Sequence, residues 1–442
     1  MRSPVRALPL LLWAVLLGTQ VTCRGGATPP GPPSVADPAV PSVSAAQAKR
    51  PVESGLQKVT EIADIRGRLR AWRLENALFV ADDGGTFFAV VQGDELVRQP
   101  ALGRGLPPEK GNEDHGSIAT VSGTWPDDVW LVWRNVGQWD EWFDRVFRLQ
   151  AGAWVQVASS SSGYLYLDTW MQEGCLVGFS SNAGFHQASR VTAEHALHCR
   201  TGSRPQLAFK GEDPMKYSVV NARGFSTGDL LLLDFDAPHV TGHNRPAPRL
   251  WVFEHGSAKP KEVELPLPAG LRERGEPVEL LDARLLARSA ADAYVVGNLA
   301  LEGEHEKGRL GSAGRWLPPL LVTFDGTSTA LAEPPPLLFI SDAVLAGDGT
   351  LVLVGGASEQ NPTELIVVAR APGGRWRALP LPVQPRSKHQ YTPFSVAARS
   401  IAEVWVTAEG ERGRFAIFRS RSEVTGAHDA SGLGGRHALY PP

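Results

Sequence analysis

The sequence predicts an all-β protein, and within that class a single β-propeller of about seven four-stranded blades. Three observations lead to this prediction. The 442 residues include 46 glycines and 35 prolines, which indicates many turns and few long helices. A short β-rich motif recurs along the chain, and a second hairpin follows each clear copy of it. Successive copies lie about 42 to 63 residues apart, which is the scale of one propeller blade.

The first 23 residues are typical of a secretory signal. A basic start precedes an apolar run over 7–17 that is too short for an ordinary membrane-spanning helix. The run ends at Cys23, where a bacterial lipoprotein signal places the cysteine that receives the lipid, but Gln20 and Thr22 depart from the usual pattern. Two outcomes stay open: lipidation of Cys23, or ordinary cleavage nearby. Both predict an exported protein of the bacterial periplasm, outer membrane or cell surface.

The composition of residues 24–55 predicts a disordered tether, and that of residues 425–442 predicts a flexible C-terminal tail. The tether is rich in Pro, Ala, Ser and Gly and has almost no large apolar side chains. It cannot bury enough apolar surface to offset the entropy lost on ordering. Residues 56–424 then remain for the propeller.

Cysteine and charge composition narrow the class further. With Cys23 lipidated or removed, Cys175 and Cys199 remain as an even pair in an oxidising compartment, which predicts a disulfide; two buried free thiols are the alternative. The net charge of -3 gives no electrostatic footprint for nucleic acid or an anionic membrane face. We expect contact with a membrane only through a lipid on Cys23.

The recurring motif is clearest at Asp128-Val-Trp-Leu-Val-Trp133, which follows a tight Trp-Pro-Asp-Asp corner. Similar runs begin at Asp229, Asp292, Thr350 and Glu403, and weaker ones at Thr86 and Gly174. The second hairpin is visible in 145–157, 249–266, 320–334, 365–381 and 414–424. We take as equivalent points Phe88, Trp130, Cys175, Leu231, Tyr294, Val352 and Trp405.

A four-stranded sheet has two apolar faces that it cannot cover alone, and stacking such sheets around an axis buries both. Trp130, Tyr294 and Trp405 are therefore predicted to fill the spaces between blades. A ring also has to close, and we expect residues 56–65 to supply the outer strand of the last blade. Rings of six or eight blades, and an open ring, are the alternatives.

The motif resembles the degenerate repeats of exported bacterial β-propeller proteins, including kelch-like propellers. In these repeats an acidic or small residue precedes Val-Trp-x-Val, as at Asp128-Val-Trp-Leu-Val132, and a later turn precedes another tryptophan. The motif is degenerate, and its copies do not share the paired glycines of a strict kelch repeat or the Trp-Asp ending of the WD type. The resemblance implies a fold and carries over no catalytic residue.

The longer connections between second and third strands are predicted to emerge on one face of the ring, where a binding site most naturally forms. One of them contains Trp139 and Trp142 beside Asp140 and Glu141. Aromatic rings next to carboxylates suit a sugar or peptide ligand, so these four are the predicted ligand-binding residues. The alternative is that both tryptophans cover the blade edge while the acids stay solvated.

Enzyme signatures are largely absent, and the sequence predicts no cofactor or metal. The chain has no phosphate-binding Gly-Lys-Ser/Thr loop and no His-Glu-x-x-His sequence. His239 and His243 lie near Asp234 and Asp236, but nearby prolines and glycine argue against the helix that would bring the imidazoles together. The "ADDGGTF" stretch (81–87) is interpreted as a turn.

Three functional hypotheses remain. The first is an exported, envelope-associated binding or scaffold protein that recognises a protein, peptide or glycan through the loop-rich face. The second is a carbohydrate-active hydrolase or lyase with carboxylates in the central funnel. The third is a purely structural part of an assembly.

Overall fold

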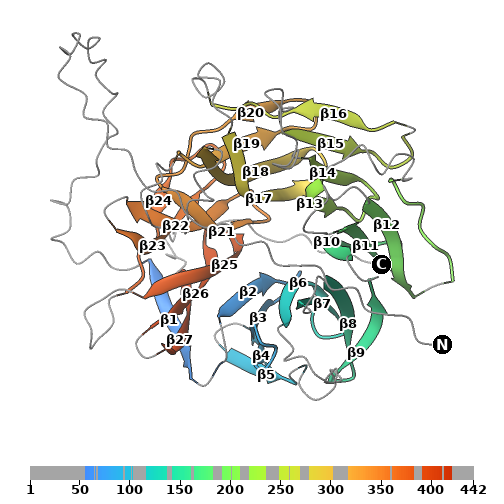
Figure 1. Cartoon of the computed structure of the whole chain (residues 1–442). Helices are drawn as coiled ribbons and strands as arrows, with labels where there is room; N and C mark the ends of the chain where they lie inside the picture. The colour runs from blue at the N-terminus through green and yellow to red at the C-terminus, as the bar shows by residue number, and fades with distance from the viewer. Residues whose placement is uncertain are drawn as a thin grey trace, which may run out of the picture. The chain divides into compact units, whose positions relative to one another are not determined.

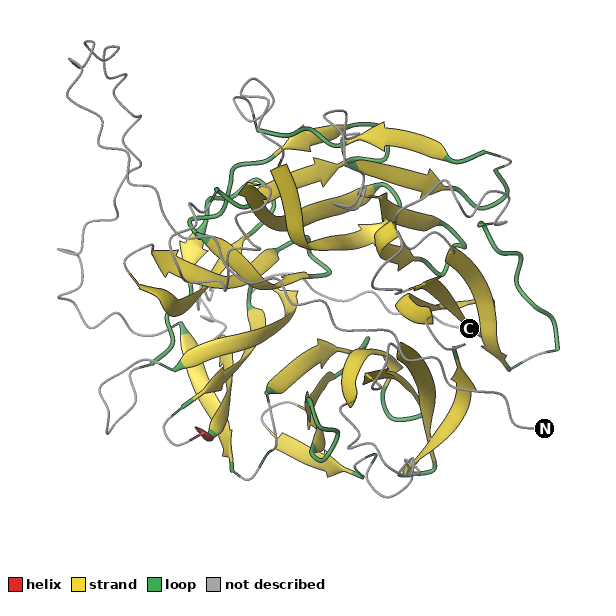
Figure 2. Cartoon of the chain, in the orientation of Figure 1, coloured by secondary structure: helices red, strands yellow, loops and turns green. Residues whose placement is uncertain are grey.

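The structure is a computed structural model in which the described residues are almost entirely β-strands and turns (Figure 2). Described are residues 55–63, 65, 68–92, 95–100, 102, 116–136, 142–160, 164–182, 192–200, 202–209, 219–234, 248–257, 259–268, 278–301, 317–358, 361–382, 391–410 and 413–420. They all belong to one compact unit, Glu53–Pro442. The predicted signal, Cys23, the tether up to residue 54 and the C-terminal tail lie outside them. Within these ranges there is no helix of the length and hydrophobicity that a bilayer crossing requires.

The described strands form six sheets, five of four strands and one of seven, in which a single parallel pairing joins β10 to β8. Divided at that pairing, they make seven blades, each ordered from an inner to an outer strand (Figure 1). The first blade holds β2 (Leu69–Arg73), β3 (Leu78–Asp82), β4 (Phe88–Gln92) and β5 (Glu95–Gln99). The second holds β6 (Gly116–Thr124), β7 (Asp128–Val136), β8 (Trp142–Gln150) and β9 (Ala153–Ser159). The third has three described strands, β10 (Tyr164–Gln172), β11 (Cys175–Asn182) and β12 (Thr192–Cys199).

The remaining four blades repeat this antiparallel order. The fourth holds β13 (Val219–Gly224), β14 (Leu230–Asp234), β15 (Arg249–Phe253) and β16 (Lys261–Glu264). The fifth holds β17 (Val278–Ser289), β18 (Asp292–Leu301), β19 (Leu320–Phe324) and β20 (Thr329–Leu331). The sixth holds β21 (Phe339–Leu345), β22 (Leu351–Ser358), β23 (Asn361–Arg370) and β24 (Arg377–Ala378). The seventh holds β25 (Thr392–Ser400), β26 (Glu403–Glu409), β27 (Phe415–Ser420) and β1 (Leu56–Ile62).

The ring closes through its first strand. β1 pairs antiparallel with β27, from Leu56 opposite Ser420 to Ile62 opposite Phe415, and is drawn in blue beside the red end of the chain in Figure 1. Each inner strand also contacts the inner strand of the next blade, and β25 contacts β2. The prediction that residues 56–65 supply the outer strand of the last blade is confirmed, with β1 spanning Leu56–Ile62, and the strand order agrees with the predicted count of about seven blades.

The apolar motif is continuous because both faces of each blade are buried. Along β7, Val129, Leu131 and Trp133 pack against the first blade, whereas Trp130 and Val132 pack against the third. Consecutive side chains of a strand point to opposite faces, so every residue of the motif meets a neighbouring blade. Seven buried clusters result, and each joins two adjacent blades.

The predicted core aromatics occupy these clusters. Trp130 is 1% exposed between the second and third blades, and Trp405 is 4% exposed between the seventh and first. Tyr294 is half-buried and packs against the cluster between the fifth and sixth blades. The placement of Phe88 as a second-strand equivalent is wrong, because Phe88 begins the third strand β4 and the second strand is β3. Both strands of this hairpin are short and apolar, so the motif did not distinguish them.

Polar contacts also cross every junction near the inner strands. They join Ser395 to Ala71 (3.3 Å), Glu75 to Gly123 (3.0 Å), Asp144 to Tyr166 (2.6 Å), Asp168 to Gly224 (2.9 Å), Asn221 to Ala283 (3.3 Å), Asn298 to Ile340 (2.7 Å) and Asp342 to Val396 (2.9 Å). Asp168, Asn221, Asp342 and Ser395 each directly follow a register shift of the inner strand. A bulge re-aims the next side chain, here toward the neighbouring blade.

The predicted disulfide is present. Cys175 and Cys199 face each other across β11 and β12 and are bonded. In the third blade, residues 202–209 follow β12 and lie against the fourth blade, where the Phe209 ring contacts the rings of Phe179 and Phe253. This segment supplies packing to a blade that has no fourth strand among the described residues.

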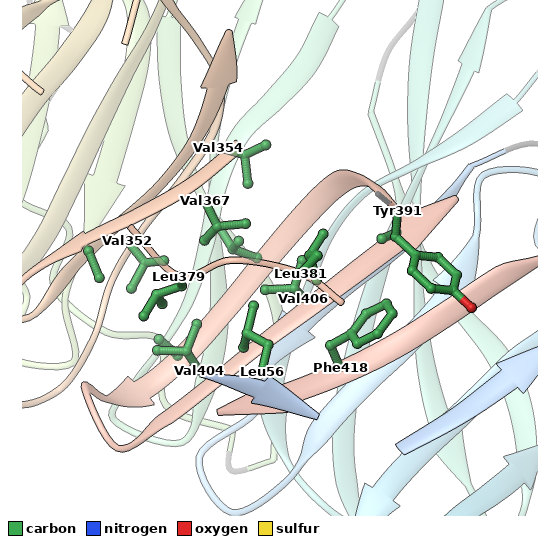
Figure 3. Packing of buried hydrophobic residues seen from close by; sticks show 14 of the residues in the cluster. Leu56, Val352, Val354, Val367, Leu379, Leu381, Tyr391, Val404, Val406 and Phe418 are labelled. Carbon is green, nitrogen blue, oxygen red and sulfur yellow. The ribbon is translucent and has the colours of Figure 1, made fainter. Parts of the chain in front are cut away.

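Closure by β1 can be tested at Leu56, which is fully buried among Val404, Phe418 and Val352 (Figure 3). Replacing Leu56 with alanine should lower the free energy of unfolding by about 2 to 5 kcal/mol, because it empties a packed site between two blades. Chemical denaturation measures this loss. Gln57→Ala on the exposed face of the same strand is the matched control and should change stability by less than about 0.5 kcal/mol. Equal effects of the two substitutions would show that β1 does not seal the ring.

Candidate functional site: the base of the β7–β8 loop

The predicted ligand-binding residues surround the connection between β7 and β8. Trp139, Asp140 and Glu141 lie outside the described residues. Trp142 is placed as the first residue of β8, where it pairs with Val136, and its side chain lies outside the description. The ligand-binding role of these four residues therefore stays a prediction. What the structure does describe is the base of the loop, where the chain leaves β7 and enters β8.

An ion pair between Arg134 of β7 and Asp144 of β8 holds the base of the loop together. Arg134 Nε lies 3.2 Å from Asp144 Oδ1, and Nη2 lies 3.2 Å from Oδ2. The two residues face each other across the strands, so the pair closes the hairpin just below the loop. Such two-point pairing fixes orientation as well as charge.

The same pair joins the second blade to the third. The Tyr166 amide donates to Asp144 Oδ2 at 2.6 Å, and Arg134 Nη2 donates to the Tyr166 carbonyl at 3.0 Å. Ser160 adds a further contact, because its hydroxyl accepts from the Asp144 amide at 2.8 Å and donates to the Tyr164 carbonyl at 2.6 Å. The start of β10 is thereby held against β8, with Tyr164 opposite Phe143 in a parallel pairing.

Burial governs the pKa values of the titratable groups at the base of the loop. It raises the pKa of the Asp144 carboxyl, while Arg134 and the Tyr166 amide oppose that rise. Burial and the Asp144 charge raise the pKa of Tyr166 to about 12, so its phenol stays protonated at neutral pH. Asp144 stands only three positions after Glu141 in the sequence, but it is fully buried within β8. It holds the scaffold and offers no carboxylate to a ligand.

Other carboxylates near the inner strands are engaged in the same way. Asp168 accepts from the Gly224 amide and pairs with Arg223 at 3.3 Å. Gly224 itself lies so close to Trp170 that a Cβ there would come within 2.1 Å of the indole, which ties the third and fourth blades together. Asp342 pairs with Arg284 and accepts from the Val396 amide.

Asp234, the described carboxylate considered for a metal site, already bonds to other side chains. Asp234 is 2% exposed, lies 3.2 Å from Arg249 Nη2 and accepts from the Trp251 indole at 3.1 Å. Asp236, His239 and His243 lie outside the described residues. Within the described ranges no group of three or more potential metal ligands occurs.

The turn after β3 is described in full. Asp82 is fully buried and accepts from the amides of Thr86 (2.7 Å) and Phe87 (2.9 Å). Gly85 adopts a φ of 64°, which favours glycine. The "ADDGGTF" stretch is therefore a self-supported turn, as its sequence predicts.

Glu194 on β12 is a titratable group that the sequence does not reveal. Its Oε2 accepts from the Phe209 amide at 2.9 Å, and its Oε1 is buried with no hydrogen-bond partner among the described residues. Burial raises the pKa of Glu194 from 4.5 to about 7, against the opposing effect of the backbone amides. A lone glutamate in a strand gives no sequence signal, because its burial depends on how residues 202–209 fold over the blade.

Comparisons with known proteins add little to the fold. No family model matches the sequence, and no curated protein matches it. Among solved structures, the N-terminal domain of Nup159 is 13% identical, with 82% of this chain and 95% of that chain covered and a TM-score of 0.41. A GH93 α-L-arabinofuranosidase of Fusarium graminearum is 11% identical, with 83% and 98% covered and a TM-score of 0.41. A prolyl endopeptidase is 11% identical, with 78% and 46% covered and a TM-score of 0.46.

These likenesses assign neither a ligand nor a reaction to this chain. The strand order itself defines the class: a seven-bladed β-propeller closed by its first strand.

The structural role of the Arg134–Asp144 ion pair can be tested by replacing Asp144 with asparagine. This change leaves Arg134 without its anion at a buried junction, and we expect a loss of about 3 to 5 kcal/mol in the free energy of unfolding. The control is Glu61→Gln, whose carboxylate pairs with Lys58 and Arg414 at the protein surface, and which should cost less than about 1 kcal/mol. Both values come from chemical denaturation. A loss at Asp144 no greater than at Glu61 would contradict a structural role for the pair.

The raised pKa of Glu194 predicts a pH dependence of stability. Between pH 4.5 and about 7 the folded protein binds this proton more tightly than the unfolded chain does, so stability falls as pH rises through that window. The loss from this group should approach about 3 kcal/mol, at about 1.4 kcal/mol for each unit of pKa difference. Urea denaturation at pH 5 and pH 8 should show a smaller decrease for Glu194→Gln than for the wild type. The same decrease in both proteins would contradict the raised pKa.

Proposed function

We propose that this protein is exported and uses a rigid propeller to present the β7–β8 loop and its neighbours to a protein, peptide or glycan of the cell envelope. The sequence supports export through its signal-like start, and the Cys175–Cys199 disulfide is consistent with an oxidising compartment. On this proposal a lipid on Cys23 would tether the propeller to a membrane; without it the protein is secreted.

The observation that carries the binding role is the Arg134–Asp144 pair with its contacts to Tyr166. A binding loop gains affinity when its ends are fixed before the ligand arrives, because less entropy is lost on binding. Here both strands that carry the loop are locked to each other and to the next blade. The loop itself contains two tryptophans and two acids, a composition suited to stacking on a sugar ring or enclosing a cationic peptide group.

A role in binding is favoured over catalysis by three carboxylates near the inner strands that are all engaged in structural contacts. Asp144, Asp168 and Asp342 each accept hydrogen bonds from neighbouring amides and pair with an arginine. These groups hold blades together, and a general acid or base needs a carboxyl group that reaches the substrate.

The test is a double variant, Trp139→Ala with Trp142→Ala, applied to a glycan array and to immobilised envelope peptides. We expect the unfolding temperature to stay nearly unchanged and binding to fall by about tenfold or more, as for aromatic anchors at other binding surfaces. A large loss of stability would show instead that the two indoles are part of the core.

Trp376→Ala is the matched control, because this indole stacks with Arg370 beside the β23–β24 turn, at the other end of a different blade. It should leave binding unchanged. Any glycan that binds is then assayed for turnover. Cleavage of a bound glycan would overturn the non-enzymatic proposal in favour of a hydrolase or lyase.

A further inference from the structure

Three arginines gather at the end of the ring away from the β7–β8 loop. The turns between first and second strands lie at this end, because the connections between second and third strands leave from the opposite end of each blade. Arg73 ends β2, while Arg288 and Arg399 lie one residue before the ends of β17 and β25. All three lie close to the turn between β21 and β22, which begins at Ala346 and contains Gly347.

Two of these arginines join neighbouring blades. Arg288 pairs with Asp292 across its own turn and donates to the Gly347 carbonyl of the next blade at 3.2 Å. Arg399 lies 3.7 Å from Glu403 across its turn and donates to the Glu75 carbonyl of the next blade at 3.4 Å. The repeated Arg-Ser-x-x-acid sequence, in 288–292 and 399–403, thus has one structural role in two blades.

Arg73 differs from both. It makes no hydrogen bond or ion pair within the described part of the chain, although a guanidinium has five N–H donors. Its Nη1 and Nη2 lie 3.2 and 3.3 Å from the place where a Cβ of Gly347 would be, and the Arg399 carbonyl oxygen lies 3.7 Å from the same place. Burial, and then the Arg399 charge, lower the pKa of Arg73, while the charges of Glu403 and Asp348 oppose that decrease.

Glu403 and Asp348 attract Arg73 through their charge, but neither forms an ion pair with it. Asp348 accepts from the amides of Thr350 (2.9 Å) and Ile401 (3.0 Å), which joins the turns of the sixth and seventh blades. Asp292 and Glu403 face the other two arginines. The donors of Arg73 are therefore left for a group from outside, over a glycine that has no side chain to cover them.

We propose that Arg73, flanked by Arg288 and Arg399 over Gly347, binds an oxyanion: a phosphate or carboxylate group of a ligand or partner. A planar guanidinium suits such groups because two parallel N–H donors match two oxygens. The site is independent of the proposed loop-face function, since it lies at the opposite end of the blades and uses different residues.

The test is calorimetric titration of the full chain with inorganic phosphate, with ionic strength held constant by chloride. Wild type should bind, and Arg73→Gln should bind about tenfold more weakly, because it loses a charge-assisted pair of hydrogen bonds. Gly347→Ala is the sharper variant. It keeps every charge but places a methyl group 3.2 Å from Arg73 Nη1, at a position where the backbone needs no glycine, and it should weaken binding as well.

Two substitutions serve as controls and should bind like the wild type. Arg414→Gln removes an exposed arginine that pairs with Glu61 on the outer strand, and Gly202→Ala adds a methyl group where nothing lies within 4 Å. Succinate titrated in the same way distinguishes a carboxylate ligand from a phosphorylated one, and binding of either supports the site. The proposal is overturned if neither anion binds the wild type, or if Arg73→Gln binds as tightly as the wild type.

Discussion

The interface between neighbouring blades is the constraint on which the rest of this structure depends. A blade has two apolar faces and an inner strand whose edge no further strand of its own sheet covers, and both problems are solved by the adjacent blade. Buried clusters fill all seven interfaces. Side chains such as Asp168 and Ser395 bond to the backbone of the next inner strand. Apolar packing supplies the stability, and the polar contacts fix how each blade is placed against the next.

This constraint explains why so much of the fold could be predicted. Burial on both faces produces runs such as Asp128-Val-Trp-Leu-Val-Trp133, and their spacing counts the blades. The closing strand could be predicted because a ring leaves the last blade one strand short. The error at Phe88 has the same origin, since second and third strands are both buried on two faces and look alike in sequence.

The candidate site was predictable only in part. The sequence locates the loop through its composition, but it cannot show which acid near the loop is buried. Asp140, Glu141 and Asp144 stand within five positions of one another, and only the strand pairing reveals that Asp144 faces Arg134 and belongs to the frame. The raised pKa of Glu194, and the lack of a partner for Arg73 among the described residues, could not be predicted from the sequence for a related reason. Each depends on a segment distant along the chain, residues 202–209 for Glu194 and Gly347 for Arg73.

The pairing of β1 with β27 also sets the order in which the molecule can be finished. The strand synthesised first has its hydrogen-bonding partner at the far end of the chain, so the disc stays incomplete until the last strand has been made. This arrangement delays closure of the ring until nearly the whole chain is available. A product truncated before Phe415 would lack β27 and leave β1 without a strand to pair with. Such an unpaired strand edge can be recognised by quality-control proteases and chaperones.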